Sequence, residues 1–319
     1  MSGLADVWSG FVDLEPVPRM AVIVGAILVV ATVLVGVLAR LKPSQDWAEL
    51  TSRVRSWWVM AGVFFAAVLI NPVLTVVIFG LLSFWALKEY ITLLPTRSAD
   101  HTALVLAFAV AIPVQYLFVA RGSYGMFVLW IPLYMFLLLP AVLVIRGETK
   151  GFVASSGQIH WGLMAFVFGL SHVPMLLRLP DGDIVGASGR ELVLFLVFVV
   201  EAGDVSQYLW GKAIGRRKVM PKVSPKKTWA GLVGGVLTVS LLSMTLMFLT
   251  PFNAWQIVVI SAITTVTGFF GDVVMSAVKR DFGVKDFGTL LPGHGGALDR
   301  VDSLVWAAPV FLHLTRFYF

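Results

Sequence analysis

A polar stretch near the C-terminus, Gly271–Ser303, carries residues whose types and spacing could do chemistry. Between Asp272 and Asp302 it holds five aspartates, four Lys or Arg residues and one histidine, with several glycines among them. The sequence on both sides is almost purely apolar. Because charges at membrane depth are costly and usually functional, we expect this stretch to hold a functional site.

A helix that continues through residue 280 would place four polar side chains of this stretch on one face. Residues at i, i+4, i+7 and i+8 share a helix face. The four residues are Asp272, Ser276, Lys279 and Arg280. We expect this stripe to face protein, and we expect Asp299 and Asp302 to lie at the start of the next helix.

The segment between these two helices cannot be helical, because Pro292 and a series of glycines break it. In Gly293-His294-Gly295-Gly296 the backbone can come close to a ligand, and its N–H groups could line phosphate oxygens. No Gly-Lys-Ser/Thr follows, so this is not a Walker loop. His294 could be a general base, a donor to phosphate or a strut of the loop.

A second polar segment, residues 201–231, contains seven Lys or Arg residues and no acidic residue after Asp204. It could be a basic patch against anionic lipid headgroups. Alternatively, Lys226 and Lys227 lie at the expected start of a helix, where free N–H groups and the helix dipole favour an anion such as phosphate. Glu201 and Asp204 either belong to the site or pair with lysines of this segment.

Carboxylates from two helix ends, a glycine loop and many cations together suggest a divalent ion that bridges to phosphates. Magnesium suits such a site, because it takes few protein carboxylates and shares its coordination shell with water and substrate phosphate. No His/Cys set fits zinc, and the chain has no cysteine. The alternative is that each aspartate simply pairs with a nearby Lys or Arg.

The composition places these motifs in a membrane protein. The chain has 319 residues, of which 58% are hydrophobic and 13% charged, whereas soluble domains are about a quarter charged. The net charge of +6 is explained by basic cytoplasmic loops, so no nucleic-acid partner is inferred. We therefore expect an all-α polytopic integral membrane protein with no sizeable soluble domain.

Ten apolar runs approach the roughly 20 residues that a membrane-spanning helix needs. Only Asn71-Pro72 separates the second and third runs, so one kinked helix is an alternative there. We expect three regions, at residues 1–101, 102–189 and 190–319, with three, three and four spans. The runs are 20–39, 57–70, 72–88, 102–120, 124–144, 159–178, 190–210, 228–250, 254–278 and 303–319.

The distribution of basic residues favours ten crossings with both termini outside. In that arrangement 19 of the 24 Lys and Arg residues fall in inner loops, as the positive-inside rule predicts. Merging the second and third runs would put the first two basic loops on opposite sides. We expect a bacterial inner-membrane protein whose site faces the cytoplasm.

Two motifs resemble those of the phosphatidate cytidylyltransferases, also called CDP-diacylglycerol synthases. The C-terminal signature is Ser276-x-x-Lys279-Arg280-x4-Lys285-Asp286-x-Gly288-x-x-Leu291-Pro292-Gly293-His294-Gly295-Gly296-x-x-Asp299-Arg300-x-Asp302. The second motif comprises Asp204-x-x-Gln207-Tyr208-x-x-Gly211-Lys212 and Ser224-Pro225-Lys226-Lys227-Thr228. The motifs cover about the C-terminal third. Ala230 departs from the Glu or Gln usual in the family, and Gly203 also differs.

The resemblance implies transfer of a cytidylyl group from CTP to phosphatidate, with release of pyrophosphate. It implies one magnesium and one potassium ion between Asp272 and Asp299, a membrane-lipid environment, and a homodimer as in other family members. The catalytic residues implied are Asp272, Asp299, Lys279, Arg280, Lys285, Asp286 and His294. The substrate-binding residues implied are Asp204, Lys212, Ser224, Lys226, Lys227, Thr228, Ser276, Gly293, Gly295, Gly296, Arg300 and Asp302.

Two other functions fit parts of the pattern. A cytidylyltransferase could act on a different lipid phosphate, such as an isoprenoid-ether lipid. An ion-coupled transporter would also have intramembrane carboxylates and broken helices. The polar clusters lie at one membrane face, however, and the two halves show no matching interruptions, which argues against a transporter.

Overall fold

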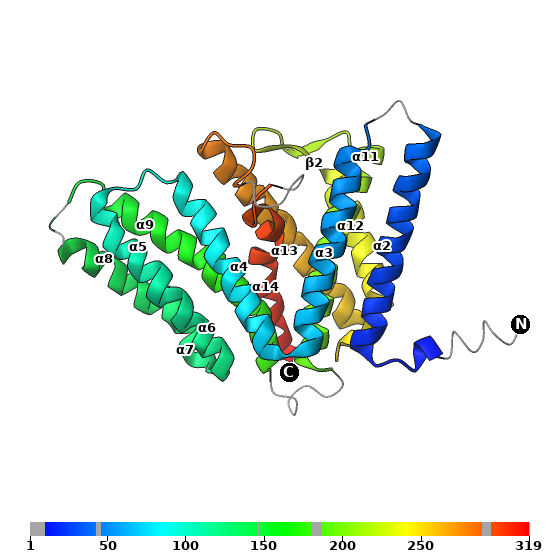
Figure 1. Cartoon of the computed structure of the whole chain (residues 1–319), viewed down its shortest axis with the longest axis horizontal. Coiled ribbons are helices and arrows are strands. Elements are labelled where there is room, and N and C mark those ends of the chain that lie inside the picture. Colours follow the sequence, from blue (N-terminus) through cyan, green and yellow to red (C-terminus); the bar gives the residue numbers. More distant parts are fainter. Residues whose placement is uncertain are drawn as a thin grey trace, which may run out of the picture.

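The computed structural model describes residues 10–42, 46–145, 147, 149–179, 187–288 and 295–318. Apolar helices account for most of these residues, as expected for an all-α membrane protein (Figure 1). Eight helical segments in these ranges are long and apolar enough to cross a membrane. Each of the ten expected runs contains a helix, but α12 (Trp229–Met244) is shorter and α14 (Leu298–Tyr318) is not among the eight. The count of ten crossings stays a prediction.

The N-terminal region consists of α2 (Pro16–Leu41), α3 (Ala48–Ile70) and α4 (Pro72–Leu93). Asn71 has extended backbone angles and caps α4, because its side chain accepts a hydrogen bond from the N–H of Val73 at 2.8 Å. The chain reverses direction at this residue (Figure 1). The alternative of one kinked helix is therefore wrong.

The middle region contains three long helices, each interrupted by a π-helical segment. Pro113 and Pro132 lie beside or within two of these interruptions, where a missing N–H favours local rearrangement. The short 3₁₀ turn η1 (Ser98–Asp100) precedes the first helix. The three helices comprise α5 (His101–Leu106), η2 (Ala107–Ala111) and α6 (Ile112–Arg121); α7 (Tyr124–Leu129), η3 (Trp130–Met135) and α8 (Phe136–Ile145); and α9 (Phe152–Gly162), η4 (Leu163–Gly169), α10 (Leu170–Met175) and η5 (Leu176–Arg178).

The C-terminal region contains α11 (Gly189–Ile214), α12, η6 (Met247–Leu249), α13 (Ala254–Asp281) and α14. Helices α11 and α12 approach closely because glycines line their contact: a Cβ added to Gly235 would lie 2.5 Å from Cγ of Gln207. Between them β1 (Lys218–Met220) and β2 (Ser224–Thr228) form a small antiparallel hairpin. We expected no sheet from the sequence, and this hairpin is the exception.

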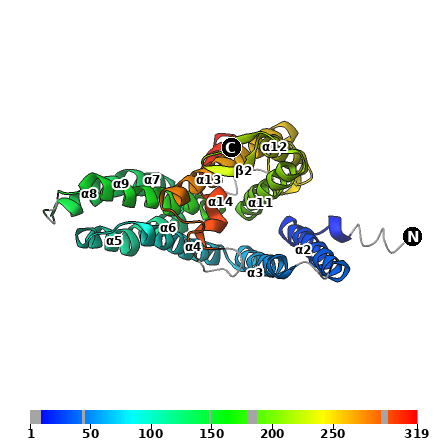
Figure 2. The same cartoon turned by 90° about the horizontal axis from the view of Figure 1, so that it is seen from above.

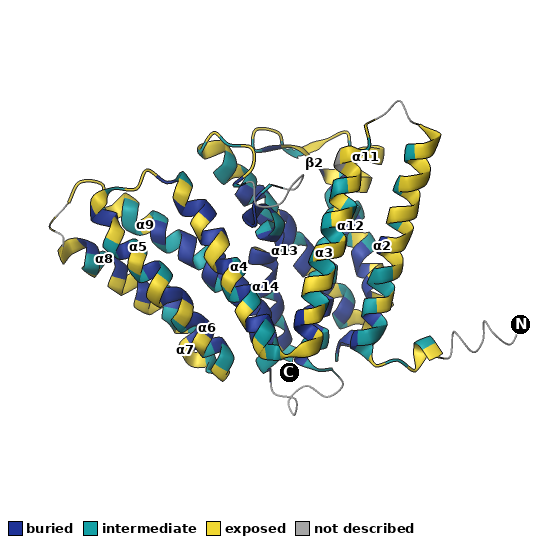
Figure 3. Cartoon of the chain, in the orientation of Figure 1, coloured by how far each residue is buried: buried dark blue, intermediate teal, exposed yellow. Residues whose placement is uncertain are grey.

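Burial separates the central helices from the lipid-facing ones. Large apolar side chains are exposed along α2, α3 and α8, whereas α14 is mostly buried and α13 is buried along one face (Figure 3). Seen from above, α14 lies in the middle of an elongated molecule, between the α5–α9 group and helices α11 and α12 (Figure 2). The polar ends of α11, α13 and α14 meet at the upper edge of Figure 1, and the C-terminal end of α14 lies at the lower edge.

Candidate active site

The upper ends of α11, β2, α13 and α14 bring the two sequence motifs together. Lys227 on β2 places its Nζ 2.6 Å from Oδ2 of Asp272 on α13. The same Nζ donates to Oε1 of Gln207 on α11, at 3.4 Å. Oδ1 of Asp272 accepts a hydrogen bond from Ser276, one turn further along α13. The predicted polar stripe therefore faces protein at Asp272, Ser276 and Lys279, and it contacts a cation from the other motif. Its last residue, Arg280, is exposed.

Burial and charge act on Lys227 in opposite directions. Burial disfavours its charged form, but the carboxylates of Asp272 and Asp204 outweigh this effect and raise the pKa of Lys227 above its ordinary value. Lys227 is therefore a fixed positive charge at neutral pH. The ammonium group can bind either a protein carboxylate or a substrate phosphate.

Two more aspartates join this cluster from α11 and α14. Ser303 on α14 donates to Oδ2 of Asp204 at 2.8 Å. Asp302 interacts electrostatically with Asp272, Asp204 and Lys279. Helix α11 continues to Ile214, ten residues beyond Asp204, and the Asp204 side chain is half-buried.

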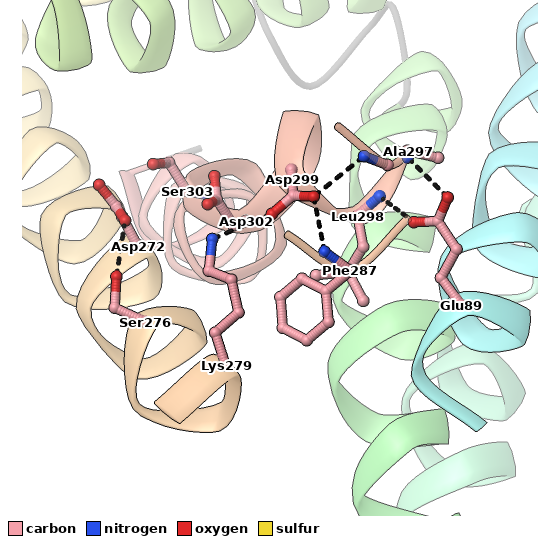
Figure 4. Close-up of polar contacts among 11 residues, drawn as sticks. Glu89, Asp272, Ser276, Lys279, Phe287, Ala297, Leu298, Asp299, Asp302 and Ser303 are labelled. Atoms are coloured by element: carbon pink, nitrogen blue, oxygen red, sulfur yellow. Dashed lines mark hydrogen bonds and ion pairs between the residues drawn. The ribbon is translucent and has the colours of Figure 1, made fainter. Parts of the chain in front are cut away.

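Asp299 is held by three hydrogen bonds at the start of α14 (Figure 4). Nζ of Lys279 donates to Oδ1 at 3.0 Å. The N–H groups of Phe287 and Gly296 both donate to Oδ2, at 2.9 and 3.0 Å. Asp299 thus orders the chain that enters and leaves the glycine-rich segment. Both Asp272 and Asp299 pair with lysines here, and their joint metal binding stays a prediction.

A small cavity opens beside these ion pairs. Its volume is about 180 Å³, less than the roughly 300–1,000 Å³ of sites that enclose whole drug-sized ligands. Four cations contribute to its wall, so it suits phosphate groups better than a complete nucleotide. The lining residues are Val223, Ser224, Pro225, Lys226, Ser276, Lys279, Arg280 and Lys285.

Some residues that the sequence predicted for the site differ from expectation in their secondary structure or lie outside the cavity. Helix α12 begins at Trp229, so Lys226 and Lys227 lie on β2 and not at a helix start, which corrects the expectation from sequence. Thr228 caps α12 through the N–H of Gly231 at 3.1 Å. Lys212 is exposed and lies near the exposed ring of Tyr208.

The remaining predicted residues lie around the signature segment. Asp286 is exposed, and Arg300 interacts electrostatically with Glu201 and Asp204. Gly293 and His294 lie outside the described residues, so their roles stay predictions. Gly295 has a φ of +80°, and a Cβ there would lie 2.8 Å from Oδ2 of Asp299.

Glu89 on α4 contacts the same segment and was not predicted. Its carboxylate accepts hydrogen bonds from the N–H groups of Ala297 and Leu298, both at 2.9 Å. We expected free N–H groups along the glycine loop, yet Gly296 donates to Asp299 and the next two residues donate to Glu89. The sequence feature that could have pointed to Glu89 is its position as an acidic residue at the end of an apolar run.

The donor chemistry of the cluster suits a hard cation. In the part of the chain that the structure describes, no three His, Cys, Asp or Glu side chains are arranged to hold a metal by themselves. The buried and half-buried side chains include five carboxylates and three cations, which, when all are ionised, leaves two negative charges to be balanced. These residues are Glu201, Asp204, Asp272, Asp299, Asp302, Lys227, Lys279 and Arg300.

Comparison with known proteins gives matches over most of the chain. The model of the cytidylyltransferase family matches residues 51–318. Uncharacterized protein YnbB of Escherichia coli (strain K12) is 45% identical over 294 residues, which is 92% of this chain and 96% of that protein.

Relatives with an activity in their names match shorter parts of the chain. The phosphatidate cytidylyltransferase of Rickettsia bellii is 30% identical over 205 residues, 61% of this chain and 86% of that protein. The enzyme of the same name from Staphylococcus saprophyticus is 40% identical over 126 residues, 39% of this chain and 48% of that protein.

Proposed function

Because this chain belongs to the cytidylyltransferase family and is a nucleotidyltransferase, we propose that it transfers the cytidylyl group of CTP to phosphatidate. A phosphate oxygen of the lipid forms a bond to the α-phosphorus of CTP. The bond from that phosphorus to the β-phosphate oxygen breaks, and its electron pair leaves with pyrophosphate. The products are CDP-diacylglycerol and pyrophosphate.

The observation that carries this proposal is the cation-lined cavity beside a carboxylate cluster at the polar end of membrane-spanning helices. Phosphatidate supplies its own nucleophilic oxygen, so the protein needs no Ser or Cys nucleophile. It must align that oxygen with the α-phosphorus and neutralise the charge on the leaving group. Lys226, Arg280 and Lys285 are exposed to the cavity and free to bind phosphates in these roles.

Two further lysines support the same proposal: Lys279 lines the cavity, and Lys227 follows the lining residue Lys226 on β2. Each is half-buried and bound to one aspartate, Asp272 or Asp299. Substrate phosphates can compete for these ammonium groups, because a lysine binds phosphate as a point charge. The two lysines then exchange a carboxylate partner for a phosphate partner without changing their place on β2 and α13.

The carboxylates released in this exchange are the groups that would hold a metal ion. We propose magnesium, which Asp272 and Asp299 would hold, as predicted from the sequence. When bound, it would neutralise the phosphate charge that develops on pyrophosphate. Among the residues that the structure describes, only Lys279 donates to Oδ1 of Asp299, so this oxygen remains a ligand candidate. Potassium as a second ion stays part of the proposal.

We further propose that the site faces the cytoplasm of a bacterial inner membrane, where CTP is available. The helix ends that flank the inner loops expected from the charge distribution lie on the same side of the bundle, the upper side in Figure 1. The same edge carries the cavity and the hairpin. The apolar sides of the spanning helices would leave the acyl chains of the substrate in the bilayer.

A lipid-acceptor panel tests the proposed activity. The purified full-length protein is incubated with magnesium and CTP that is labelled at the α-phosphate, together with phosphatidate, an isoprenoid-ether lipid phosphate or no acceptor. We expect labelled lipid with phosphatidate. Product only with the isoprenoid acceptor would keep the reaction type and change the substrate, whereas no labelled lipid with any acceptor would contradict the proposal.

A further inference from the structure

The carboxylate of Glu89 lies far from the motifs in sequence and directly beside them in space. It comes from α4 in the N-terminal region, is only 8% exposed, and binds the two N–H groups that open α14 (Figure 4). A helix N-terminus favours a carboxylate, because its first N–H groups have no partner inside the helix. Glu89 therefore caps α14 from another helix.

Two glycines of the signature leave room for this carboxylate. A Cβ on Gly288 would lie 2.5 Å from Oε1 of Glu89, and a Cβ on Gly296 would collide with Oε2. Neither glycine has a positive φ, so the backbone conformation does not require glycine at these positions. The carboxylate cannot simply move aside, since each of its oxygens is held by an N–H group.

The neighbouring residue of α4 holds the other end of the same segment. The ring of Tyr90 lies 6.0 Å, between centroids, from that of Phe282, where α13 ends. Its hydroxyl donates to the carbonyl oxygen of Gln158 at 3.2 Å, which fixes the ring against α9. The end of α4 thus contacts the chain just before and just after the signature loop.

The contact of Glu89 continues into the candidate site through one residue. Leu298, whose N–H binds Glu89, is followed by Asp299, whose carboxylate binds Lys279 and the N–H of Phe287. The three consecutive N–H groups from Gly296 to Leu298 are all bound by these two carboxylates. A shift of the α14 start would therefore move the ion pair of Asp299 and Lys279.

We propose that Glu89 is a positioning residue, which fixes the start of α14 and so holds Asp299 and Lys279 in place without touching substrate. The consequence for turnover rests on the proposed function. The structural part of the proposal, that Glu89 fixes the start of α14, does not rest on the proposed function, because hydrogen exchange at Ala297 and Leu298 measures it directly.

Glu89→Gln tests the contact in the full-length protein. The amide keeps the shape of the side chain but has only one acceptor oxygen in place of two. Its NH₂ group therefore faces one of the two backbone N–H donors, and that hydrogen bond is lost. We expect peptides that contain Ala297 and Leu298 to exchange at least about tenfold faster, since a charge-assisted hydrogen bond is lost. Exchange indistinguishable from that of the unmodified protein would overturn the proposal.

Glu191→Gln is the matched control. Glu191 accepts a hydrogen bond from the N–H of Ser188 at 2.7 Å and also caps a helix, but α11 begins at the opposite edge of the molecule. In this variant we expect faster hydrogen exchange near Ser188 and an unchanged exchange rate at Ala297. If the two variants lost thermal stability equally and also lost turnover equally, Glu89 would be only structural.

The activity arm separates positioning from binding. Glu89→Gln should lower kcat by at least about tenfold while the KM for CTP changes less, because Glu89 is not one of the residues that line the cavity. An equal effect of Glu191→Gln on kcat would contradict this. If the unmodified protein shows no cytidylyl transfer at all, the proposed function fails, and the exchange measurements still decide the inference.

Gly288→Ala approaches the same contact from the opposite side, in case Glu89→Gln does not fold. Alone, the added methyl group should push against the carboxylate and speed exchange at Leu298. Combined with Glu89→Ala, which removes the carboxylate, the methyl group should have little further effect on exchange. Additive effects of the two substitutions would show that the residues do not act through this contact.

Discussion

Lys227 and Asp272 join the two sequence motifs directly, with 2.6 Å between Nζ and Oδ2. The lysine belongs to the basic hairpin and the aspartate to the helix that leads into the signature. A second pair, Lys279 with Asp299, connects that helix to α14 in the same way. Two of the cations that we expect to bind phosphate therefore form ion pairs with the carboxylates that we expect to bind the metal.

This arrangement predicts different effects for the two adjacent lysines of β2. Lys226→Ala removes an exposed cavity cation and should raise the KM for CTP or phosphatidate about ten- to a hundredfold, which corresponds to about 1.5–3 kcal/mol. Its thermal stability should not change. Steady-state kinetics in detergent and in vesicles, with Lys222→Ala as an exposed hairpin control, check this. A loss seen only in neutral-lipid vesicles would instead indicate a headgroup patch.

Lys227→Ala should lower both turnover and stability. It leaves the half-buried Asp272 without its cation, and an uncompensated buried charge is costly. Thermal unfolding should shift to lower temperature, and added magnesium should restore part of that loss by binding the carboxylate. Normal turnover in this variant would mean that Lys227 is not part of the machinery.

The orientation of the site can be measured with single cysteines, because the chain has none of its own. Lys218→Cys lies on the exposed part of β1, and Arg121→Cys lies at the opposite edge, at the end of α6. In intact cells an impermeant thiol reagent should label residue 121 and not residue 218. The reverse pattern would invert the proposed topology.

Ala230 departs from the family pattern and lies in the first turn of α12. Ala230→Glu adds a carboxylate near Lys226 and Lys227, where its negative charge would also interact favourably with the positive end of the α12 dipole. We expect activity within several-fold of the unmodified protein in the CTP assay. A large gain would show that a carboxylate at this position serves the reaction.

The fold was largely predictable because its elements are set by local patterns. Ten apolar runs predict helices, and the Asn71-Pro72 pair became a reversal because Asn71 caps the following helix. The hairpin was missed since three- and five-residue strands rich in lysine have no apolar alternation to reveal them. Because of this hairpin, Lys226 and Lys227 lie on a strand and not at the helix start that we expected.

The site was predictable only where it is local in sequence. The stripe from Asp272 to Arg280 follows from helical spacing, and the structure confirms that it faces protein at all but the exposed Arg280. Glu89 could not be predicted in this way, because it binds N–H groups 208 and 209 residues away. Pairing of Asp272 and Asp299 with lysines depends on how three elements pack, which no spacing encodes.

Asp299→Asn should differ from Asp272→Asn in its effect on the fold. Asp299 accepts three hydrogen bonds, two of them from backbone N–H groups, and an amide cannot accept all three. We expect lower thermal stability together with lost turnover. Unchanged unfolding temperature would show that the three hydrogen bonds contribute little.

The most direct test of the account compares the unmodified protein with Asp272→Asn across a magnesium series. CTP labelled at the α-phosphate and CTP labelled at the γ-phosphate are supplied with phosphatidate in parallel, and thermal unfolding is measured on the same samples. We predict that α-label enters lipid and γ-label leaves as pyrophosphate, both only with magnesium. Asp272→Asn should unfold near the same temperature, because Lys227 still has the carboxylate of Asp204 near it, and should lose turnover by several orders of magnitude. Substantial turnover in Asp272→Asn, or α-label that never enters lipid, would contradict the account.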